Sequence, residues 1–208
     1  PLDRARFSTG NPPMRVHYPL SYAANLGEWK VWDPVNQEGG NGAFVPGRIG
    51  HSSAGFTDGA SNTLAFAEVK GFTPHFRNAN RSGELEMLND TNLCTAGGDF
   101  RADTGHTEWV DGRVHHSGFT TVFPPNSKVS CLINNKQYNP DWTNMQEGKS
   151  TTVTTYAAVT SRSFHYAGVH ASFCDGRTSF ITEAIEVDIW RALSTRHGNE
   201  VIMNRDFQ

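Results

Sequence analysis

Apolar and polar positions alternate most regularly near the end of the chain, on either side of Asp175-Gly176. Alternation with a period of two predicts β-strands, and Asp-Gly between two such runs predicts a hairpin with a two-residue type I′ turn. In that register Phe173 faces Thr178, and the ribbon has one apolar face and one polar face. The apolar face would carry Val169, Ala171, Phe173 and Phe180.

The pattern changes to a helical period after this hairpin, over residues 187–198. Ile189 and Leu193 are spaced so that both face inward. Asp188 is a suitable N-cap and Gly198 a suitable terminator. The segment therefore predicts one short helix near the end of the chain.

Shorter apolar runs predict further strands earlier in the chain. Within residues 21–34 an extended segment would place Trp29 and Val31 on the same side and end at Asp33-Pro34. Other candidate strands cover residues 63–71, 108–112, 119–123 and 151–160. A short helix beginning at Ala60 is the alternative to the first of these.

The segments between these runs are polar and rich in turn residues. Residues 36–55 resemble a Gly-rich loop, and residues 134–150 another polar loop. Residues 73–106 are interpreted as a long surface insertion, with a short helix at 83–88. Residues 1–20 are Pro-rich and irregular. The 20 Gly and 10 Pro fit a chain with many turns.

The 208 residues fit one globular domain, residues 1–208, with 13 Phe, 5 Trp and 5 Tyr to supply its core. The formal net charge is −3 and the basic residues form no block, which argues against binding of nucleic acid through its phosphates. No uninterrupted apolar run reaches the length of about 18 residues that a membrane-spanning helix needs.

Acidic residues gather around residues 99–111 and suggest a cation site. Asp99, Asp103 and Asp111 lie there with Glu108, and nearby glycines would let such a loop bring carboxylates together. Ca²⁺ prefers several oxygen ligands of this kind, although the spacing matches no EF-hand loop. Calcium held by Asp99, Asp103 and Asp111 is therefore one hypothesis, and solvated loop carboxylates are the alternative.

The histidines give no catalytic motif. Neighbouring residues on a strand point to opposite faces, so His115-His116 would not share one metal ion. His165 could act as a general base, but the sequence holds no Gly-x-Ser-x-Gly, His-Glu-x-x-His or phosphate-loop motif. The alternative is a histidine bonded to the backbone at the start of a strand. His165, Asp175 and Gly176 would then form a structural motif.

Tryptophans are candidates for stacking on sugar rings, because an indole offers a flat apolar face. Burial in the core is the alternative for most of them, since large aromatic side chains are usually buried. The four candidates are Trp29, Trp32, Trp109 and Trp142.

The hairpin region resembles a family signature. The segment FHYAGVHASFCDGRTSFI (164–181) is similar to the C-terminal His-x9-Asp-Gly signature of the prepilin-like domain-of-unknown-function family 1559, abundant in planctomycete bacteria. The resemblance departs from the family pattern at Tyr166-Ala167, His170 and Cys174. It covers nearly the whole chain, and the other agreeing segments are SYAANLG (21–27), TDGASNT (57–63), EWVDG (108–112), TTVFPPN (120–126) and IWRALSTRHGNEVI (189–202).

The resemblance implies an α+β fold, a pseudopilin-like head dominated by antiparallel β-sheet with long loops and a short C-terminal helix. It also implies export, to the cell envelope, the cell surface or the extracellular space. Such heads normally follow a hydrophobic N-terminal helix, which this sequence lacks and which would be the only contact with the membrane. The resemblance implies no reaction.

The resemblance also bears on the cysteines. Cys174 lies on a predicted strand and stands where the family has a small residue, so we expect a free thiol. Cys94 and Cys131 lie in loop-rich regions and are then the expected disulfide of an exported chain.

Three functions follow as hypotheses. The first is a non-enzymatic, pseudopilin-like subunit of a bacterial surface or filament assembly, with copies of itself or related pilin-like subunits as partners. The second is a module that binds an extracellular polysaccharide. The third is an enzyme, such as a hydrolase or lyase of environmental polymers, which would need clustered carboxylates or histidines in a pocket.

Overall fold

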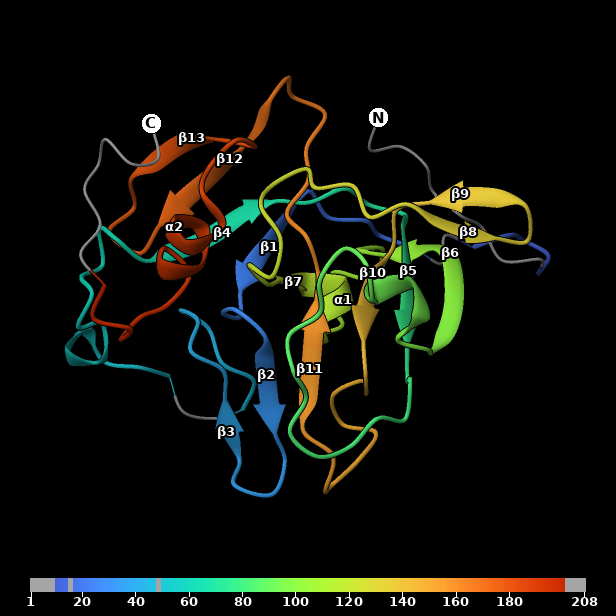
Figure 1. Ribbon diagram of the computed structural model, residues 1–208, viewed down its shortest axis with the longest axis horizontal. Helices are drawn as coiled ribbons and strands as arrows, with labels where there is room; N and C mark the ends of the chain where they lie inside the picture. Colours follow the sequence, from blue (N-terminus) through green and yellow to red (C-terminus); the bar gives the residue numbers. More distant parts are fainter. Residues whose placement is uncertain (1–9, 15–16, 48–49, 201–208) are drawn as a thin grey trace.

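The computed structural model describes residues 10–14, 17–47 and 50–200, whose elements are arranged as in Figure 1. Within these residues the strands form a five-stranded sheet, a six-stranded sheet and a small hairpin. The α-helices of this part of the chain, α1 (Val114–Ser117) and α2 (Val187–Ala192), are short. The expected β-rich α+β class is therefore confirmed. Residues 1–9 and 15–16 of the Pro-rich start lie outside the described residues.

The five-stranded sheet carries α2 on one face. Its strands, in spatial order, are β13 (Thr178–Thr182), β12 (Gly168–Phe173), β4 (Leu64–Glu68), β1 (Tyr22–Asn25) and β7 (Gly118–Phe119). β1 pairs antiparallel with β4 and parallel with β7. Trp190 and Leu193 pack against this face, where Ala67 and Ala171 leave room for the large indole. The opposite face of the sheet carries the partly exposed side chains of Tyr22, Phe66 and Phe180.

The six-stranded sheet contains a parallel pair, β5 and β10, within an otherwise antiparallel order. Its strands, in spatial order, are β3 (Glu38–Gly39), β2 (Lys30–Asp33), β11 (Thr155–Ala158), β10 (Asp141–Thr143), β5 (Thr73–Arg77) and β6 (Asp99–Gly105). Its core is aromatic, with Trp29, Phe76, Trp142 and Tyr156. The remaining elements are β8 (Cys131–Ile133), β9 (Lys136–Tyr138), η1 (Ser53–Gly55) and η2 (Leu93–Thr95).

The short helix α1 links the two sheets. It contacts β1 and β7 of one sheet and β10 of the other. Val114 on this helix is fully buried with Leu26, Val31 and Val159. Residues carried by α1 are therefore held by both sheets at once.

The β12–β13 hairpin has a different turn from the predicted one. Ser172 pairs with Thr178, and the N–H of Phe173 donates to the carbonyl of Arg177 at 2.8 Å, so the loop contains three residues, 174–176, and not two. The N–H of Gly176 donates to the carbonyl of Phe173 at 3.0 Å, and Gly176 has φ +91° while Asp175 is not in the left-handed region. This matches a three-residue loop with a glycine bulge, which needs positive φ at one position only.

The changed register moves a side chain from one face to the other. Val169 pairs with Ile181, and Ile181 is fully buried. Phe180 pairs with His170 on the outer face and is 40% exposed, so its predicted place in the core was wrong. A slip of one residue reverses every side chain of a strand, because the period is two.

Several predicted elements are shorter than expected. The strand at 63–71 is confirmed as β4, while residues 151–160 contribute only β11 and residues 119–123 only part of β7. The helix at 187–198 ends after Ala192, with Glu186 and not Asp188 at its N-cap. Residues 108–112 form a turn joined to Tyr18 by a single bridge, not a strand.

Three segments predicted as loops contain strands, and the first of them, residues 36–55, contains the short β3. Residues 73–106 begin with β5 and end with β6, which pair with each other, and residues 83–88 are not helical. Residues 134–150 contain β9 and β10. The predicted surface insertion is therefore part of the six-stranded sheet.

The expected cysteine pairing is present. Cys94 and Cys131 are joined by a disulfide with their Cα atoms 5.4 Å apart, and Cys174 is free. Burial raises the pKa of the Cys174 thiol to about 11. Cys174 is therefore protonated and weakly reactive at neutral pH.

Candidate functional site

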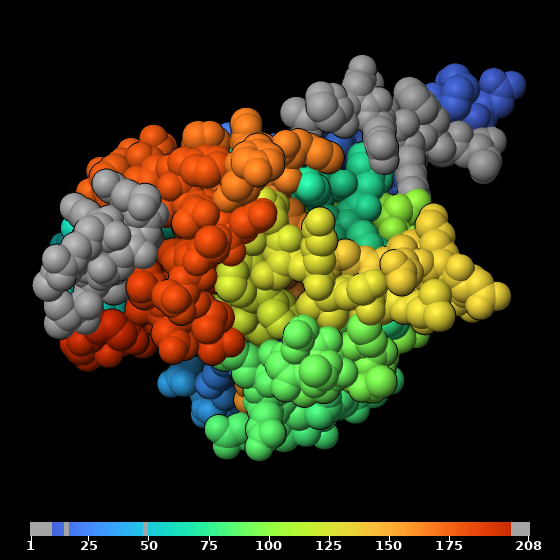
Figure 2. All heavy atoms as spheres, turned by 45° about the horizontal axis from the view of Figure 1, so that its top comes forward, coloured from blue at the N-terminus to red at the C-terminus, as the bar shows by residue number. Residues whose placement is uncertain are grey.

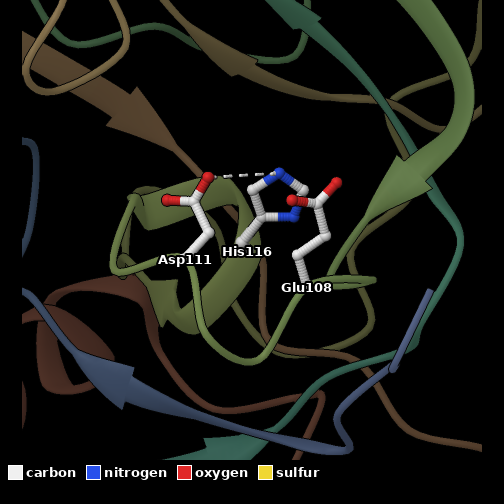
Figure 3. Close-up of side chains that lie close together, drawn as sticks. All are labelled: Glu108, Asp111 and His116. Atoms are coloured by element: carbon white, nitrogen blue, oxygen red, sulfur yellow. Dashed lines mark ion pairs between the residues drawn. The ribbon is translucent and has the colours of Figure 1, made fainter. Parts of the chain in front are cut away.

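A turn at residues 108–111 brings two carboxylates together. The N–H of Asp111 donates to the carbonyl of Glu108 at 3.0 Å, so the first and last residues of the turn are neighbours. Both side chains lie beside the ring of His116, which comes from α1 (Figure 3). One oxygen of each acid and one ring nitrogen of His116 lie within 4.8 Å of one another. We call Glu108, Asp111 and His116 the acid–histidine cluster.

The imidazole of His116 is buried and has no hydrogen-bond partner among the described residues. Its side chain is 5% exposed, and its Nε2 lies 3.9 Å from Oδ2 of Asp111, too far for a hydrogen bond. Its Nδ1 is buried without a partner in that same part of the chain. Burial lowers the pKa of His116, so the ring is neutral near pH 7 and one nitrogen keeps a free electron pair.

Arg113 and Glu147 fix the surroundings of the cluster. Arg113 donates to Oδ1 of Asp111 from its backbone N–H and to Oδ2 from Nη1, both at 3.0 Å. Oε1 of Glu147 accepts the backbone N–H of Val114, the first residue of α1, at 2.9 Å. Burial raises the pKa of Glu147 to about 7. The carboxylate of Asp111 and the start of α1 therefore have fixed positions.

Glu108 and Asp111 of the cluster, though not His116, line a shallow surface cavity of about 670 Å³ together with Arg113 and Glu147. Trp32 also lines this cavity and, at the same time, a larger cleft of about 1360 Å³. The two hollows therefore meet at this tryptophan.

The larger cleft combines aromatic and charged walls. Residues 37–41 and 45–47 of the Gly-rich loop form one wall, and Trp32 and Tyr156 contribute aromatic surface. Glu28 and Arg196 add opposite charges. Arg196 donates from Nη1 to two carbonyls of the loop at 2.7 and 2.8 Å, so this wall is fixed to the body of the protein.

Two of the four tryptophans predicted for sugar stacking are core residues. Trp29 and Trp142 are 7% and 0% exposed, and their rings stack on each other with centroids 5.7 Å apart. Trp142 therefore cannot stack on a ligand, which corrects that prediction, whereas the small exposed part of Trp29 lines the larger cleft. Trp32 lines both hollows, and Trp109 is 63% exposed at the tip of the turn.

The predicted calcium ligands do not converge. Asp99 and Asp103 lie on β6, and neither belongs to the ligand group found in the described residues. Sequence reasoning found Asp111, noted Glu108 as a neighbour and missed His116. It missed His116 because it placed this residue on a strand, whereas α1 turns the ring toward the acids. The available signal for His116 was its place in the sequence, a few residues after the turn that carries Glu108 and Asp111.

His165 and Asp175 do not meet. They lie beyond opposite ends of β12. The Nε2 of His165 is 3.2 Å from Oε1 of Glu68, and its ring contacts that of His170 with centroids 4.9 Å apart. The side chain thus pairs with a carboxylate and not with the backbone, which corrects that expectation. The separation argues against a catalytic pair.

A group of buried histidines lies behind the cluster. Burial lowers the pKa of His75 to about 4 and that of His106 to about 3, and it also lowers the pKa of His115. The rings of His75 and His115 contact each other with centroids 4.9 Å apart. These side chains form a core of neutral imidazoles between β5 and α1.

A protein-family model matches residues 4–188, and its description is "Protein of unknown function (DUF1559)". The chain belongs to the DUF1559 family. No curated protein and no solved structure matches this DUF1559 chain. In the part of the DUF1559 chain that the structure describes, no helix has the length and apolar character needed to cross a membrane.

Proposed function

We propose that this DUF1559 chain is the head of a non-enzymatic, pseudopilin-like subunit of a bacterial envelope assembly, and that it associates with copies of itself. The association would use the exposed face of the five-stranded sheet. We call this surface the outer sheet face and define it by Tyr22, Phe66, Glu68, His170 and Phe180.

The aromatic character of the outer sheet face carries the proposal. Phe66 and Phe180, on β4 and β13, are 42% and 40% exposed, and Tyr22 on β1 is 57% exposed. Phe44 packs on Phe66 with ring centroids 4.9 Å apart. Aromatic side chains are enriched in protein interfaces, and extended exposed apolar patches are uncommon on monomeric proteins.

The one acid of this face is already paired within the subunit. Oε1 of Glu68 lies 3.2 Å from Nε2 of His165, and its Oε2 accepts the backbone N–H of His170 at 2.7 Å. The face therefore offers a partner mainly its aromatic side chains, and a second copy would present the same aromatic patch in a two-fold interface. The Cys94–Cys131 disulfide supports export, because such bonds persist in oxidising compartments.

Sedimentation of the purified chain over a range of concentrations tests the association. The parent should self-associate, and Phe66→Ser with Phe180→Ser should weaken association about tenfold or more. Leu132→Ser is the matched control, because Leu132 is 70% exposed on the β8–β9 hairpin, which projects away from the orange β12–β13 segment in Figure 2. A parent that stays monomeric, or an equal loss in Leu132→Ser, would contradict the proposal.

Polysaccharide binding in the larger cleft is a second candidate, favoured by the position of Trp32 between the two hollows. Its half-buried indole, with charged and amide groups nearby, is the usual composition of a ligand cleft. Titration of intrinsic fluorescence with soluble laminarin and with alginate tests a neutral and an acidic polymer. Trp32→Ala should weaken binding about tenfold, and Trp109→Ala should leave it unchanged. No binding of either polymer, or equal effects of both variants, would count against this candidate.

A further inference from the structure

We propose that Glu108, Asp111 and His116 bind a divalent transition-metal ion, with Zn²⁺ as the representative, and that the ion fixes the exposed turn at Trp109 and Val110. The site is independent of the proposed self-association. It also differs from the calcium site expected at Asp99, Asp103 and Asp111.

The backbone already brings the three side chains together. The hydrogen bond from Asp111 to Glu108 closes the turn, and Glu147 anchors the start of α1 through Val114. The ligand atoms are within 4.8 Å of one another. Zn²⁺ binds oxygen and nitrogen at about 2.0–2.2 Å, so small side-chain rotations would complete the contacts.

His116 provides an observation that does not depend on the acids. A buried polar side chain without a hydrogen bond is costly and rare in folded proteins. The side chain of His116 is only 5% exposed, its Nδ1 is buried without a hydrogen bond among the described residues, and its Nε2 lies 3.9 Å from Oδ2 of Asp111, beyond hydrogen-bond distance. Its Nε2 points to the carboxylate of Asp111 across a gap of 3.9 Å. An ion between them would give this nitrogen the partner that it lacks.

The neighbouring charges are compatible with a cation. Glu108 and Asp111 contribute two negative charges, and Arg113 offsets one of them through Asp111. A carboxylate oxygen has two lone pairs, so Asp111 can keep its bond to Arg113 while it binds a metal ion. Arg113 would then hold Asp111 in position, as residues behind metal ligands commonly do.

The ligand types select a transition metal over calcium. Ca²⁺ prefers about six to eight oxygen ligands, and this cluster offers two carboxylates. Imidazole nitrogen suits Zn²⁺ and its neighbours in the first transition row. Three protein ligands leave a coordination position open toward the cavity that contains Trp32.

Binding would have a structural consequence at the rim of this cavity. Trp109 and Val110 are 63% and 73% exposed at the centre of the turn. An ion held by both ends of the turn and by α1 would cross-link them and restrict the motion of this apolar tip.

Calorimetric titration of the chelator-treated protein with ZnCl₂ tests the site. We expect one tight site that Glu108→Gln and Asp111→Asn each weaken about tenfold or more. Asp99→Asn is the acidic control and should bind as the parent does. His165→Gln is the histidine control, because His165 and His170 are exposed and could hold zinc adventitiously.

Two further measurements distinguish the outcomes. Amide hydrogen exchange over residues 108–117 should slow with Zn²⁺ in the parent and not in Glu108→Gln. Titration with CaCl₂ should give binding at least about tenfold weaker than Zn²⁺. Loss of zinc binding in His165→Gln, retention in both acid variants, absence of zinc binding in the parent, or calcium binding as tight as zinc binding would each overturn the proposal.

Discussion

The protonation state of the buried histidines depends on their surroundings. An imidazole transferred from water to a closed interior favours its neutral form, because the charged form loses its hydration. His75 is 1% exposed, and burial is the largest cause of its low pKa. The sequence did not predict that His75 is buried, because the segment that forms β5 was interpreted as part of a surface insertion. Its protonation state was therefore not predicted either.

His75 should make the protein less stable in acid. Its pKa is lowered from 6.5 to about 4 in the folded state, so as the pH falls below 6.5 the unfolded state takes up a proton first. Stability then falls between pH 6.5 and pH 4, by up to about 3 kcal/mol for this one group. Urea unfolding at pH 7 and pH 5 should show a smaller loss for His75→Gln than for the parent and for the surface control His170→Gln. The same pH dependence in all three proteins would contradict this.

At the scale of elements, the sequence predicted strands where apolar residues alternate and missed strands with buried polar residues. β10 is buried along its length but consists of Asp141, Trp142 and Thr143. Its Asp141 accepts hydrogen bonds from the backbone of Thr160 and from Arg162. Such partners come from distant parts of the chain, so the local pattern resembled a loop. The hairpin at Asp175 was predicted correctly because apolar and polar residues alternate on both sides of it. Its loop length was predicted wrongly, because the sequence around the turn does not determine that length.

The ion pair between β10 and the segment after β11 should contribute strongly to the stability of the fold. Nη1 of Arg162 and Oδ1 of Asp141 are 2.6 Å apart, and both side chains are buried. Asp141→Leu leaves Arg162 charged and unpaired, which should cost about 3–5 kcal/mol. The double variant Asp141→Leu/Arg162→Met should be less destabilised than this single variant, because no charge is left buried. Denaturant unfolding of the parent, Asp141→Leu, Arg162→Met and the double variant measures the difference, and additive losses of the two single variants would contradict the prediction.

At the scale of the whole molecule, the candidate site is assembled from segments that are far apart in sequence. The larger cleft takes residues from β2, the Gly-rich loop, β11 and the region of Arg196. No local pattern relates these segments, so the sequence predicted the β-rich class and the disulfide but not the cleft. The acid–histidine cluster was predicted in part, because its three residues all lie within residues 108–116.

The disulfide Cys94–Cys131 should contribute to the stability of the whole fold. It joins η2 to β8 across a sequence separation of 37 residues, and both regions pack on the aromatic core of the six-stranded sheet. Closing a loop of this length reduces the entropy of the unfolded chain and is worth about 2–4 kcal/mol. Adding a reductant should lower the free energy of unfolding of the parent by this amount, as measured by denaturant unfolding. Cys94→Ala/Cys131→Ala should be less stable than the parent and insensitive to the reductant, while Cys174→Ala should respond to the reductant as the parent does. A parent whose unfolding midpoint is unchanged by reduction, with the bond verified as broken by mass spectrometry, would show that the crosslink does not stabilise the fold.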